Sequence, residues 1–561
     1  MRVFAGLLGT VCVMGCMLLA PLYARQPVRA KQGMVVAQEP LAVDVGVQIL
    51  KTGGNAIDAA VAVGFALAVT HPYAGNLGGG GFMLIRFADG RSTFIDFRER
   101  APAAATRSMY LDAAGNVTRA SVEGWQSSGV PGTVRGLEFA AAKYGKRKWA
   151  ELLAPATQLA TQGFPVSYAL AESLKENPKL PQSPESKRIF QKNGVFFAPG
   201  ETLRQPELAR TLGRIAVGGA REFYEGETAR TLAAEMARHG GLITLADLKD
   251  YAAIERAPLK GTYEGYEILT APPPSSGGIG ILQMLGMLDG SGYEKTGAGS
   301  AASIHYVAEA MRRFFADRSQ YLGDPDFSRL RVSELLDPKY LKAQQATILT
   351  YRATPSASVR PGLPAAERGG QTTHYNVVDA AGNAVAVTYT INDRYGNGIT
   401  VPGLGFLLND EMDDFTSKPG VPNSFGLIQG EINAIEPKKR PLSSMTPTIL
   451  ARDGQFYMAL GAPGGSRIIT AVLQVLLNVV DFKMNVQDAV DAPRFHHQWQ
   501  PDSLFLEPGV SPDTAALLRS RGHTLDLAPG WVPSQVNAIL RDGGWLQGAS
   551  DDRATGKAAG Y

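Results

Sequence analysis

The residue types in this 561-residue chain exclude most common catalytic arrangements. The chain has no G-x-S-x-G elbow, no H-E-x-x-H and no C-x-x-C, the local signatures of α/β-hydrolases, zinc proteases and redox dithiols. Of its seven histidines, His496 and His497 are adjacent and would point apart on a regular element, a poor geometry for one metal ion. We therefore expect no metal, no cofactor and no Ser-His-Asp hydrolase. The catalytic arrangement that remains is a hydroxyl nucleophile activated by a base other than histidine or a metal-bound group.

Thr372 fits that description if a peptide cut makes it the first residue of a chain. An N-terminal threonine supplies its own base, because its α-amine, with a reference pKa of about 8, lies beside its hydroxyl. Residues 353–371 are rich in Thr, Pro, Ser, Ala, Gly and Arg, which predicts a flexible, exposed linker. This linker ends directly before Thr372, as a cut after Gln371 requires.

The segment that begins at Thr372 predicts a β-hairpin. Residues 372–378 and 384–390 are rich in Val, Tyr and Thr and flank a turn-forming loop centred on Ala381. Pairing about this centre sets Thr372 opposite Thr390 at the open end. The pleat then places the valines and tyrosines on one face and these two threonines on the other. A strand pair that packs only for its β-propensity is the simpler interpretation.

The elements around this hairpin indicate antiparallel sheets covered by helices, an α+β fold. Strands are predicted at residues 82–87, 92–97, 448–451, 456–460, 536–540 and 545–548. Helices are predicted at residues 53–69, 140–153, 206–217, 228–239, 302–321 and 467–480. Four glycines at 78–81 lead into a strand, which favours close backbone packing against a site over a phosphate loop. Arg98 follows the strand 92–97, where an arginine is a surface or ion-pair residue or, alternatively, a clamp for a substrate carboxylate.

The first residues predict a targeting segment. Arg2 precedes an apolar run, and Ala24 ends a small-residue site, so residues 1–24 are interpreted as a signal peptide for export to the periplasm. An uncleaved membrane anchor and full secretion are the alternatives. Both cysteines, Cys12 and Cys16, lie in this segment, so the mature chain has no disulfide. With 45% hydrophobic residues and a net charge of +3, the chain is globular and no nucleic-acid partner is indicated.

From about residue 33 to Tyr561 the sequence closely resembles the γ-glutamyltranspeptidases, members of the N-terminal-nucleophile (Ntn) hydrolase superfamily. The motifs that carry the resemblance are Gly-Gly-Asn-Ala-Ile-Asp-Ala-Ala at 53–60, Asp-Phe-Arg-Glu at 96–99, Thr-Thr-His-Tyr at 372–375, Arg-Pro-Leu-Ser-Ser-Met at 440–445, Pro-Gly-Gly-Ser-Arg at 463–467, Pro-Arg-Phe-His-His-Gln at 493–498 and Gly-Ala-Ser-Asp at 548–551. The resemblance implies a four-layer αββα sandwich of two antiparallel sheets. It also implies self-cleavage between Gln371 and Thr372 into a large subunit, residues 25–371, and a small catalytic subunit, residues 372–561. The two would stay associated as a heterodimer, one intertwined globular unit.

The resemblance further implies the chemistry. Thr372 Oγ would attack the preceding carbonyl in the precursor and later the γ-glutamyl carbonyl of glutathione or a related compound, with its own amine as general base. Thr390 would hydrogen-bond this nucleophile. Gly464 and Gly465 would donate backbone N–H groups to the oxyanion, which suits a turn before a helix, although a Gly-rich turn with no such role is the alternative. The glutamyl group would pass to an acceptor amino acid, a peptide or water.

Substrate recognition is implied in the same way. The positions that match the family's carboxylate binders are Arg98, Ser443 and Ser444, and those that match its amine binders are Asn392, Glu411 and Asp414. From the residues alone, the acidic run at 410–414 is equally a solvated or Ca²⁺-binding loop. Phe425 matches the aromatic residue of an active-site lid. A glutaryl-cephalosporin acylase and an unprocessed, inactive binding protein are the alternative functions.

Overall fold

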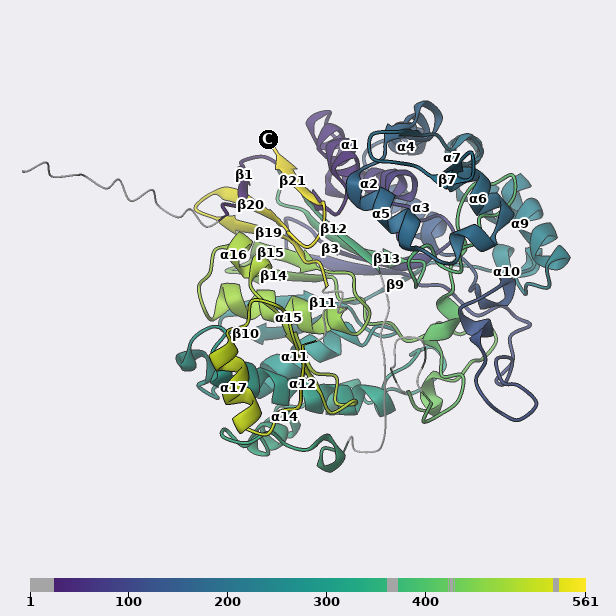
Figure 1. Ribbon diagram of the computed structural model, residues 1–561. Coiled ribbons are helices and arrows are strands. Elements are labelled where there is room, and N and C mark those ends of the chain that lie inside the picture. The colour runs from purple at the N-terminus through teal and green to yellow at the C-terminus, as the bar shows by residue number, and fades with distance from the viewer. Residues whose placement is uncertain (1–24, 361–371, 422, 424–426, 428, 528–533) are drawn as a thin grey trace, which may run out of the picture.

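The computed structural model describes residues 25–360, 372–421, 423, 427, 429–527 and 534–561. Two seven-stranded sheets form the centre of the molecule, and helices cover the outer side of each (Figure 1). The predicted four-layer αββα arrangement is therefore confirmed. The predicted signal peptide, Gln371 and Phe425 lie outside the described residues.

The first sheet is antiparallel throughout. Its strands, in spatial order, are β21 (Lys557–Gly560), β2 (Met34–Ala37), β12 (Thr373–Val378), β13 (Ala384–Thr390), β3 (Gly80–Arg86), β4 (Ser92–Phe97) and β9 (Ile254–Arg256). β12 and β13 form the predicted hairpin, and the predicted register is correct: Thr373 pairs with Tyr389, and Val378 pairs with Ala384. The hairpin thus occupies the middle of its sheet, between β2 and β3.

The second sheet is also antiparallel. Its strands, in spatial order, are β1 (Val28–Ala30), β20 (Trp545–Ser550), β19 (Asn537–Asp542), β15 (Gln455–Gly461), β14 (Thr448–Arg452), β11 (Tyr266–Thr270) and β10 (Leu259–Tyr263). The predicted hairpins at 448–460 and 536–548 correspond to β14–β15 and β19–β20. In the first sheet β2 lies between β21 and β12, and in the second sheet β1 and β11 flank the block β20-β19-β15-β14. The segments before and after position 372 are therefore interleaved.

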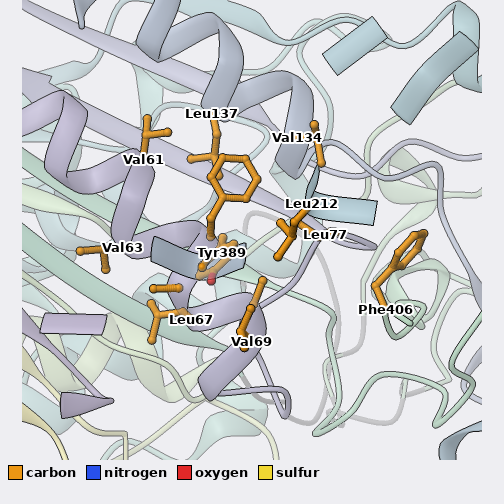
Figure 2. Close-up of a cluster of buried hydrophobic side chains, with 14 of the residues drawn as sticks. Val61, Val63, Leu67, Val69, Leu77, Val134, Leu137, Leu212, Tyr389 and Phe406 are labelled. Carbon is orange, nitrogen blue, oxygen red and sulfur yellow. The ribbon is translucent and has the colours of Figure 1, made fainter. Parts of the chain in front are cut away.

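One helical layer covers the outer face of the first sheet. Its helices are α1 (Pro40–Lys51), α2 (Ala56–Thr70), α3 (Thr133–Tyr144), α4 (Trp149–Gln162), α5 (Tyr168–Glu176), α6 (Pro184–Phe190), α7 (Pro206–Gly218), α8 (Ala220–Glu225), α9 (Glu227–Arg238) and α10 (Leu245–Lys249). Every residue of α2 is buried, as its Ala-rich sequence predicts. Figure 2 shows Tyr389 among apolar side chains of this layer, and its hydroxyl donates a 2.9 Å hydrogen bond to the Gly64 carbonyl of α2.

The other helical layer covers the second sheet. Its helices are α11 (Gly277–Leu288), α12 (Ala301–Tyr321), α13 (Val332–Leu335), α14 (Pro338–Ala346), α15 (Arg467–Val480), α16 (Val486–Asp491) and α17 (Pro512–Ser520). Apolar residues of α11, α12 and α15 pack with both sheets in one continuous core. Within the part of the chain that the structure describes, no helix is long and apolar enough to span a bilayer.

Two expectations from the sequence are wrong. The predicted helix 140–153 is broken, because α3 ends before Gly145 and α4 begins at Trp149. The predicted exposed linker does not begin at residue 353. The N–H of Ser356 donates a 2.7 Å hydrogen bond to Asp502, and Trp499 Nε1 donates to the carbonyls of Ser356 and Val359 at 2.9 and 2.8 Å. Residues 353–359 are therefore anchored, and residues 361–371 lie outside the described part.

Candidate active site

The ends of four neighbouring strands bring the predicted site residues to one edge of the first sheet. Thr372 precedes β12, Thr390 ends β13, and Thr390 pairs with Gly80 at the start of β3. Arg98 directly follows β4, whose last residue pairs with Gly81. Because the strands are antiparallel, the start of one and the end of the next meet at the same edge. Thr372, Thr390 and Arg98 therefore share this edge.

The two threonines at the open end of the hairpin are buried. Thr372 is 5% exposed and Thr390 is 2% exposed. The Thr390 carbonyl accepts a 2.9 Å hydrogen bond from Asn76 Nδ2, and Thr390 Oγ1 accepts a 2.8 Å bond from the N–H of Asn392. These contacts fix both the backbone and the hydroxyl of Thr390 at the end of β13, next to the start of β12.

The glycine run before β3 allows this close packing. A Cβ atom on Gly79 would lie 2.0 Å from the Thr390 carbonyl oxygen, and one on Gly80 would lie 2.4 Å from the Phe97 carbonyl oxygen. Neither position can accept a side chain without moving backbone atoms. The predicted close backbone packing of the glycine run is confirmed.

A polar layer joins the hairpin to the second sheet next to Thr372. His374 contacts Thr388 Oγ1 at 2.8 Å and Asn376 Oδ1 at 3.0 Å, and burial lowers the pKa of His374 to about 3. Asn376 Nδ2 donates to the carbonyl of Asn537 on β19 at 2.9 Å, and Asn537 Nδ2 donates back to the His374 carbonyl at 2.8 Å. These two hydrogen bonds thus connect β12, which follows Thr372, to β19 of the second sheet.

Gly464 and Gly465 lie in the turn between β15 and α15. The last residue of β15, Gly461, packs on the His374 ring, where an added Cβ would lie 2.3 Å from a ring carbon. Gly464 and Gly465 have φ angles of +128° and +57°, which favour glycine, and no side chain caps the start of α15. Uncapped amides at a helix start attract negative charge, as an oxyanion site requires.

Arg98 lies at the centre of a buried cluster of charges. Its guanidinium forms ion pairs with Glu411 and Asp414, and Glu99 lies 3.5 Å from Arg98 Nη1. Arg98 and Glu411 are each 1% exposed on the side chain. Arg98 also donates to the carbonyls of Pro441 and Leu442 at 3.3 and 3.4 Å, directly before Ser443. Arg98, a predicted carboxylate binder, is therefore in contact with Glu411 and Asp414, two predicted amine binders.

Burial and charge act against each other in this cluster. Burial lowers the pKa of Arg98, but attraction to Glu411, Asp414 and Glu99 outweighs it and leaves the pKa above its usual value. Burial raises the pKa of Glu411 and of Asp414 above their usual values, although Arg98 opposes the rise. Burial raises the pKa of Glu99 to about 7. One arginine thus faces three carboxyl groups that are costly to ionise.

The remaining predicted binders adjoin this cluster. Ser443 and Ser444 are 2% and 8% exposed and follow the residues that Arg98 contacts. Asn392 has a φ of +72°, and its Nδ2 donates a 2.9 Å hydrogen bond to the Asp410 carbonyl, next to Glu411. Among the described residues, no group of three or more His, Cys, Asp or Glu is arranged to hold a metal ion.

Comparisons with known proteins identify the family of this chain. A family model described as Gamma-glutamyltranspeptidase matches residues 42–561. The chain belongs to the γ-glutamyltranspeptidase family. The glutathione hydrolase proenzyme of Escherichia coli is 51% identical over 539 residues, which cover 95% of this chain and 93% of that relative. The glutathione hydrolase proenzyme of Pseudomonas aeruginosa is 46% identical over 530 residues, covering 93% and 94%. The resemblance drawn from the motifs is confirmed.

Solved structures of γ-glutamyltranspeptidases and acylases share the fold. The cephalosporin acylase from Bacillus halodurans has a TM-score of 0.85 at 28% identity, covering 98% of this chain and 99% of its own. The Helicobacter pylori γ-glutamyltranspeptidase has a TM-score of 0.58 at 42% identity, covering 61% of this chain and 98% of its own. These similarities place this family member among the Ntn hydrolases, as predicted.

Sequence analysis missed several residues of the site. Asn76 holds Thr390, and Gln38 accepts a 2.8 Å hydrogen bond from Thr373 Oγ1. Arg318 of α12 donates a 3.1 Å hydrogen bond to Ser444 Oγ. Asn76 lies two residues before the glycine run at 78–81, and this position could have indicated a role for its side chain in the site. The sequence around Arg318 did not indicate a site residue, because a charged residue in a predicted helix is usually exposed to water.

Proposed function

We propose that Thr372 is the nucleophile of a self-processing γ-glutamyltransferase and glutathione hydrolase. The observation that carries this proposal is the position of Thr372 at the sheet edge that also holds Thr390 and the Arg98 charge cluster. In the precursor, Thr372 Oγ attacks the Gln371 carbonyl, and the C–N bond between Gln371 and Thr372 breaks, which leaves an ester on Oγ and a free Thr372 amine. Water then hydrolyses the ester, so the chain that ends in the Gln371 carboxylate separates from a Thr372 with a free hydroxyl and a free amine. That amine then serves as the general base.

Catalysis by the processed enzyme has two acyl-transfer steps. Thr372 Oγ attacks the γ-carbonyl of glutathione or a related γ-glutamyl compound, and the amine of the leaving group departs with the proton. The backbone N–H groups of Gly464 and Gly465 stabilise the oxyanion, a contribution of about 3 kcal/mol for one such donor. An amino acid, a peptide or water then attacks the γ-glutamyl ester and regenerates Thr372.

The Arg98 cluster suits a substrate that carries both a carboxylate and an ammonium group. The α-carboxylate would take the place of Glu411 and Asp414 beside Arg98, with Ser443 and Ser444 as further donors. The α-ammonium would pair with Glu411 and Asp414, next to Asn392. The zwitterion thus exchanges the ion pairs of Arg98 with Glu411 and Asp414 for ion pairs with the substrate, so these three buried charges keep their partners.

The subunit arrangement follows from the interleaved sheets. After a cut before Thr372, the small subunit contributes β12–β15 and β19–β21, and the large subunit contributes the strands that flank them. The two subunits would share ladders at β2–β12, β13–β3 and β11–β14, so a stable heterodimer is expected. For the mature enzyme we propose export to the periplasm after removal of residues 1–24.

A glutaryl-cephalosporin acylase is the second candidate. It is favoured by the TM-score of 0.85 to a cephalosporin acylase and by 38% identity over 542 residues to the acylase ACY 1 proenzyme of a Pseudomonas species. Glutaryl groups lack the α-amine, so they would leave Glu411 and Asp414 without a cationic partner. This difference favours γ-glutamyl compounds.

Two measurements on the purified protein test the proposed function. A denaturing gel should show two bands of roughly 37 and 20 kDa, and the smaller chain should begin Thr-Thr-His-Tyr. The kcat/KM for glutathione should exceed that for a glutaryl amide at least about tenfold. A single full-length band would contradict self-processing, and a preference for the glutaryl amide would favour the acylase.

A further inference from the structure

Arg318 is a buried arginine that the mechanism above does not use. It lies on α12 and is 2% exposed. Its Nε donates a 2.8 Å hydrogen bond to Ser276 Oγ, and its Nη2 donates a 3.1 Å bond to Ser444 Oγ. Its Nη1 is buried without a hydrogen-bond partner, and no carboxylate of the described residues lies within ion-pair distance. A buried arginine without a carboxylate is costly, which points to a role beyond stability.

The direction of these hydrogen bonds orients the predicted carboxylate binders. A serine hydroxyl has one proton to donate and two lone pairs. Ser444 Oγ uses a lone pair to accept from Arg318, so its own proton remains available for a ligand. Ser276 Oγ also accepts from Arg318 and donates its proton to the Ser443 carbonyl at 2.7 Å. Arg318 therefore contacts Ser444 directly and supports Ser443 through Ser276.

Arg318 also offsets the excess of negative charge around Arg98. Arg98 forms ion pairs with Glu411 and Asp414 and lies close to Glu99, and a substrate carboxylate would add a fourth anion to this site. Asp414 interacts electrostatically with Arg318, whose pKa burial lowers to about 10, so Arg318 stays charged at neutral pH. Arg318 is a second cation, hydrogen-bonded to Ser444, and its charge reduces the electrostatic repulsion between the buried carboxylates and an incoming substrate carboxylate.

We propose that Arg318 is a positioning residue for the α-carboxylate of the substrate, acting through Ser443 and Ser444 and through its own charge. This inference rests on the proposed function, because it assumes that a γ-glutamyl α-carboxylate binds beside Ser444. It assigns to the large subunit a second arginine that sets specificity for that carboxylate. Arg98 would contact the substrate carboxylate, whereas Arg318 would orient Ser443 and Ser444 beside that carboxylate.

The test compares two p-nitroanilides that differ only in the α-carboxylate. L-γ-glutamyl-p-nitroanilide has it, whereas 4-aminobutyryl-p-nitroanilide keeps the amine and lacks it. In the Arg318→Gln variant, KM for the γ-glutamyl compound should rise about tenfold or more, with kcat within about threefold of wild type. The kcat/KM for the 4-aminobutyryl compound should stay within about threefold. The ratio of the two kcat/KM values should therefore fall.

Two further variants keep the test decisive. Ser276→Ala removes the hydroxyl that accepts from Arg318 Nε and donates to the Ser443 carbonyl, and it keeps the hydrogen bond from Arg318 to Ser444. It should lower the same ratio of kcat/KM values by a smaller factor than Arg318→Gln does. This variant also tests the inference if Arg318→Gln does not fold. Arg313→Gln is the matched control, because Arg313 is a buried arginine of the same helix that pairs with Glu309. It should lower the melting temperature and leave the ratio unchanged.

The outcomes separate this inference from the proposed function. If wild type cleaves the γ-glutamyl compound and the ratio is unchanged in both Arg318→Gln and Ser276→Ala, Arg318 has no positioning role and the inference is overturned. If Arg318→Gln lowers kcat/KM equally for both compounds, its role is only structural, which also overturns it. If wild type does not cleave the γ-glutamyl compound at all, the proposed function itself fails.

Discussion

Arg98 and Glu411 form a buried ion pair that joins the end of β4 to the residues that follow the β12–β13 hairpin. One partner comes from the predicted large subunit and the other from the predicted small subunit. The pair is therefore a contact between the two segments, and it lies in the proposed binding site for a zwitterionic substrate. Its loss should affect stability and substrate binding together.

Arg98→Gln should leave Glu411, Asp414 and Glu99 buried without their main cation. We expect a loss of about 3 kcal/mol or more in the free energy of unfolding, because removal of one partner of a buried ion pair leaves uncompensated charge. The KM for a γ-glutamyl substrate should rise about a hundredfold. Thermal unfolding and steady-state kinetics measure the two effects.

Arg100→Gln is the control for that variant. Arg100 pairs with Asp250, whose side chain is 51% exposed, so its loss should cost less than about 1 kcal/mol and leave KM unchanged. Equal effects of the two substitutions would contradict a special role for Arg98.

Stability should decrease with rising pH through the titration of Glu99. Burial raises the pKa of Glu99 from 4.5 to about 7. Between these values the folded protein keeps a proton that the unfolded chain has released, so the free energy of unfolding falls as the pH rises. The contribution is about 3 kcal/mol. Relative to wild type, Glu99→Gln should flatten the plot of melting temperature against pH in this range, whereas Glu123→Gln on the surface should not. Parallel wild-type and Glu99→Gln plots would refute this assignment.

Gly464→Ala should disrupt the turn that leads into α15. An added Cβ would lie 2.2 Å from Ser534 Oγ, and the φ of +128° disfavours alanine. We expect kcat to fall about a hundredfold, the typical effect of losing an oxyanion donor. Gly454→Ala is the matched control, because its φ of +72° is also positive and its Cβ would meet no atom within 4 Å. It should lower stability by about 1 kcal/mol and leave kcat unchanged. A normal kcat in Gly464→Ala would exclude the oxyanion role.

Asp502→Asn should release the segment that precedes the predicted cut. Asp502 accepts the 2.7 Å hydrogen bond from the Ser356 N–H and pairs with Arg312. Its loss should speed limited proteolysis within residues 353–360, read by mass spectrometry of the fragments. Asp513→Asn on α17 is the control and should leave that rate unchanged. An unaltered rate in Asp502→Asn would show that the hydrogen bonds from Trp499 to Ser356 and Val359 suffice as the anchor.

The hairpin, its register and the buried helix α2 could be predicted because each is determined by the residue pattern within its own segment. Strict alternation and a turn-forming loop set the register of β12 and β13, and an Ala-rich run with no polar stripe indicates a fully buried helix. The Arg98, Glu411 and Asp414 positions followed from family motifs. Their direct contact did not, since it joins two segments that are more than 300 residues apart in the chain.

The failures have tertiary causes. The helix predicted across Gly145 is interrupted because Asp58 accepts hydrogen bonds from the N–H groups of Lys146 and Arg147, at 2.9 and 3.1 Å. The segment 353–359 has a linker composition but is held by Asp502 and Trp499, which are far away in the chain. Arg318 was overlooked because α12 is buried on most sides, whereas its charged residues suggest a solvent-exposed face.

The most direct test of the central claim is the N-terminal sequence of the small chain in wild type, Thr372→Ala and Thr373→Ala. Wild type and Thr373→Ala should each give two chains, the smaller beginning at residue 372, and both should cleave γ-glutamyl-p-nitroanilide. Thr372→Ala should remain a single full-length chain without activity, because it lacks the hydroxyl that attacks the Gln371 carbonyl. A Thr372→Ala protein that still cuts before residue 372, or that remains active, would contradict the assignment of Thr372 as the nucleophile.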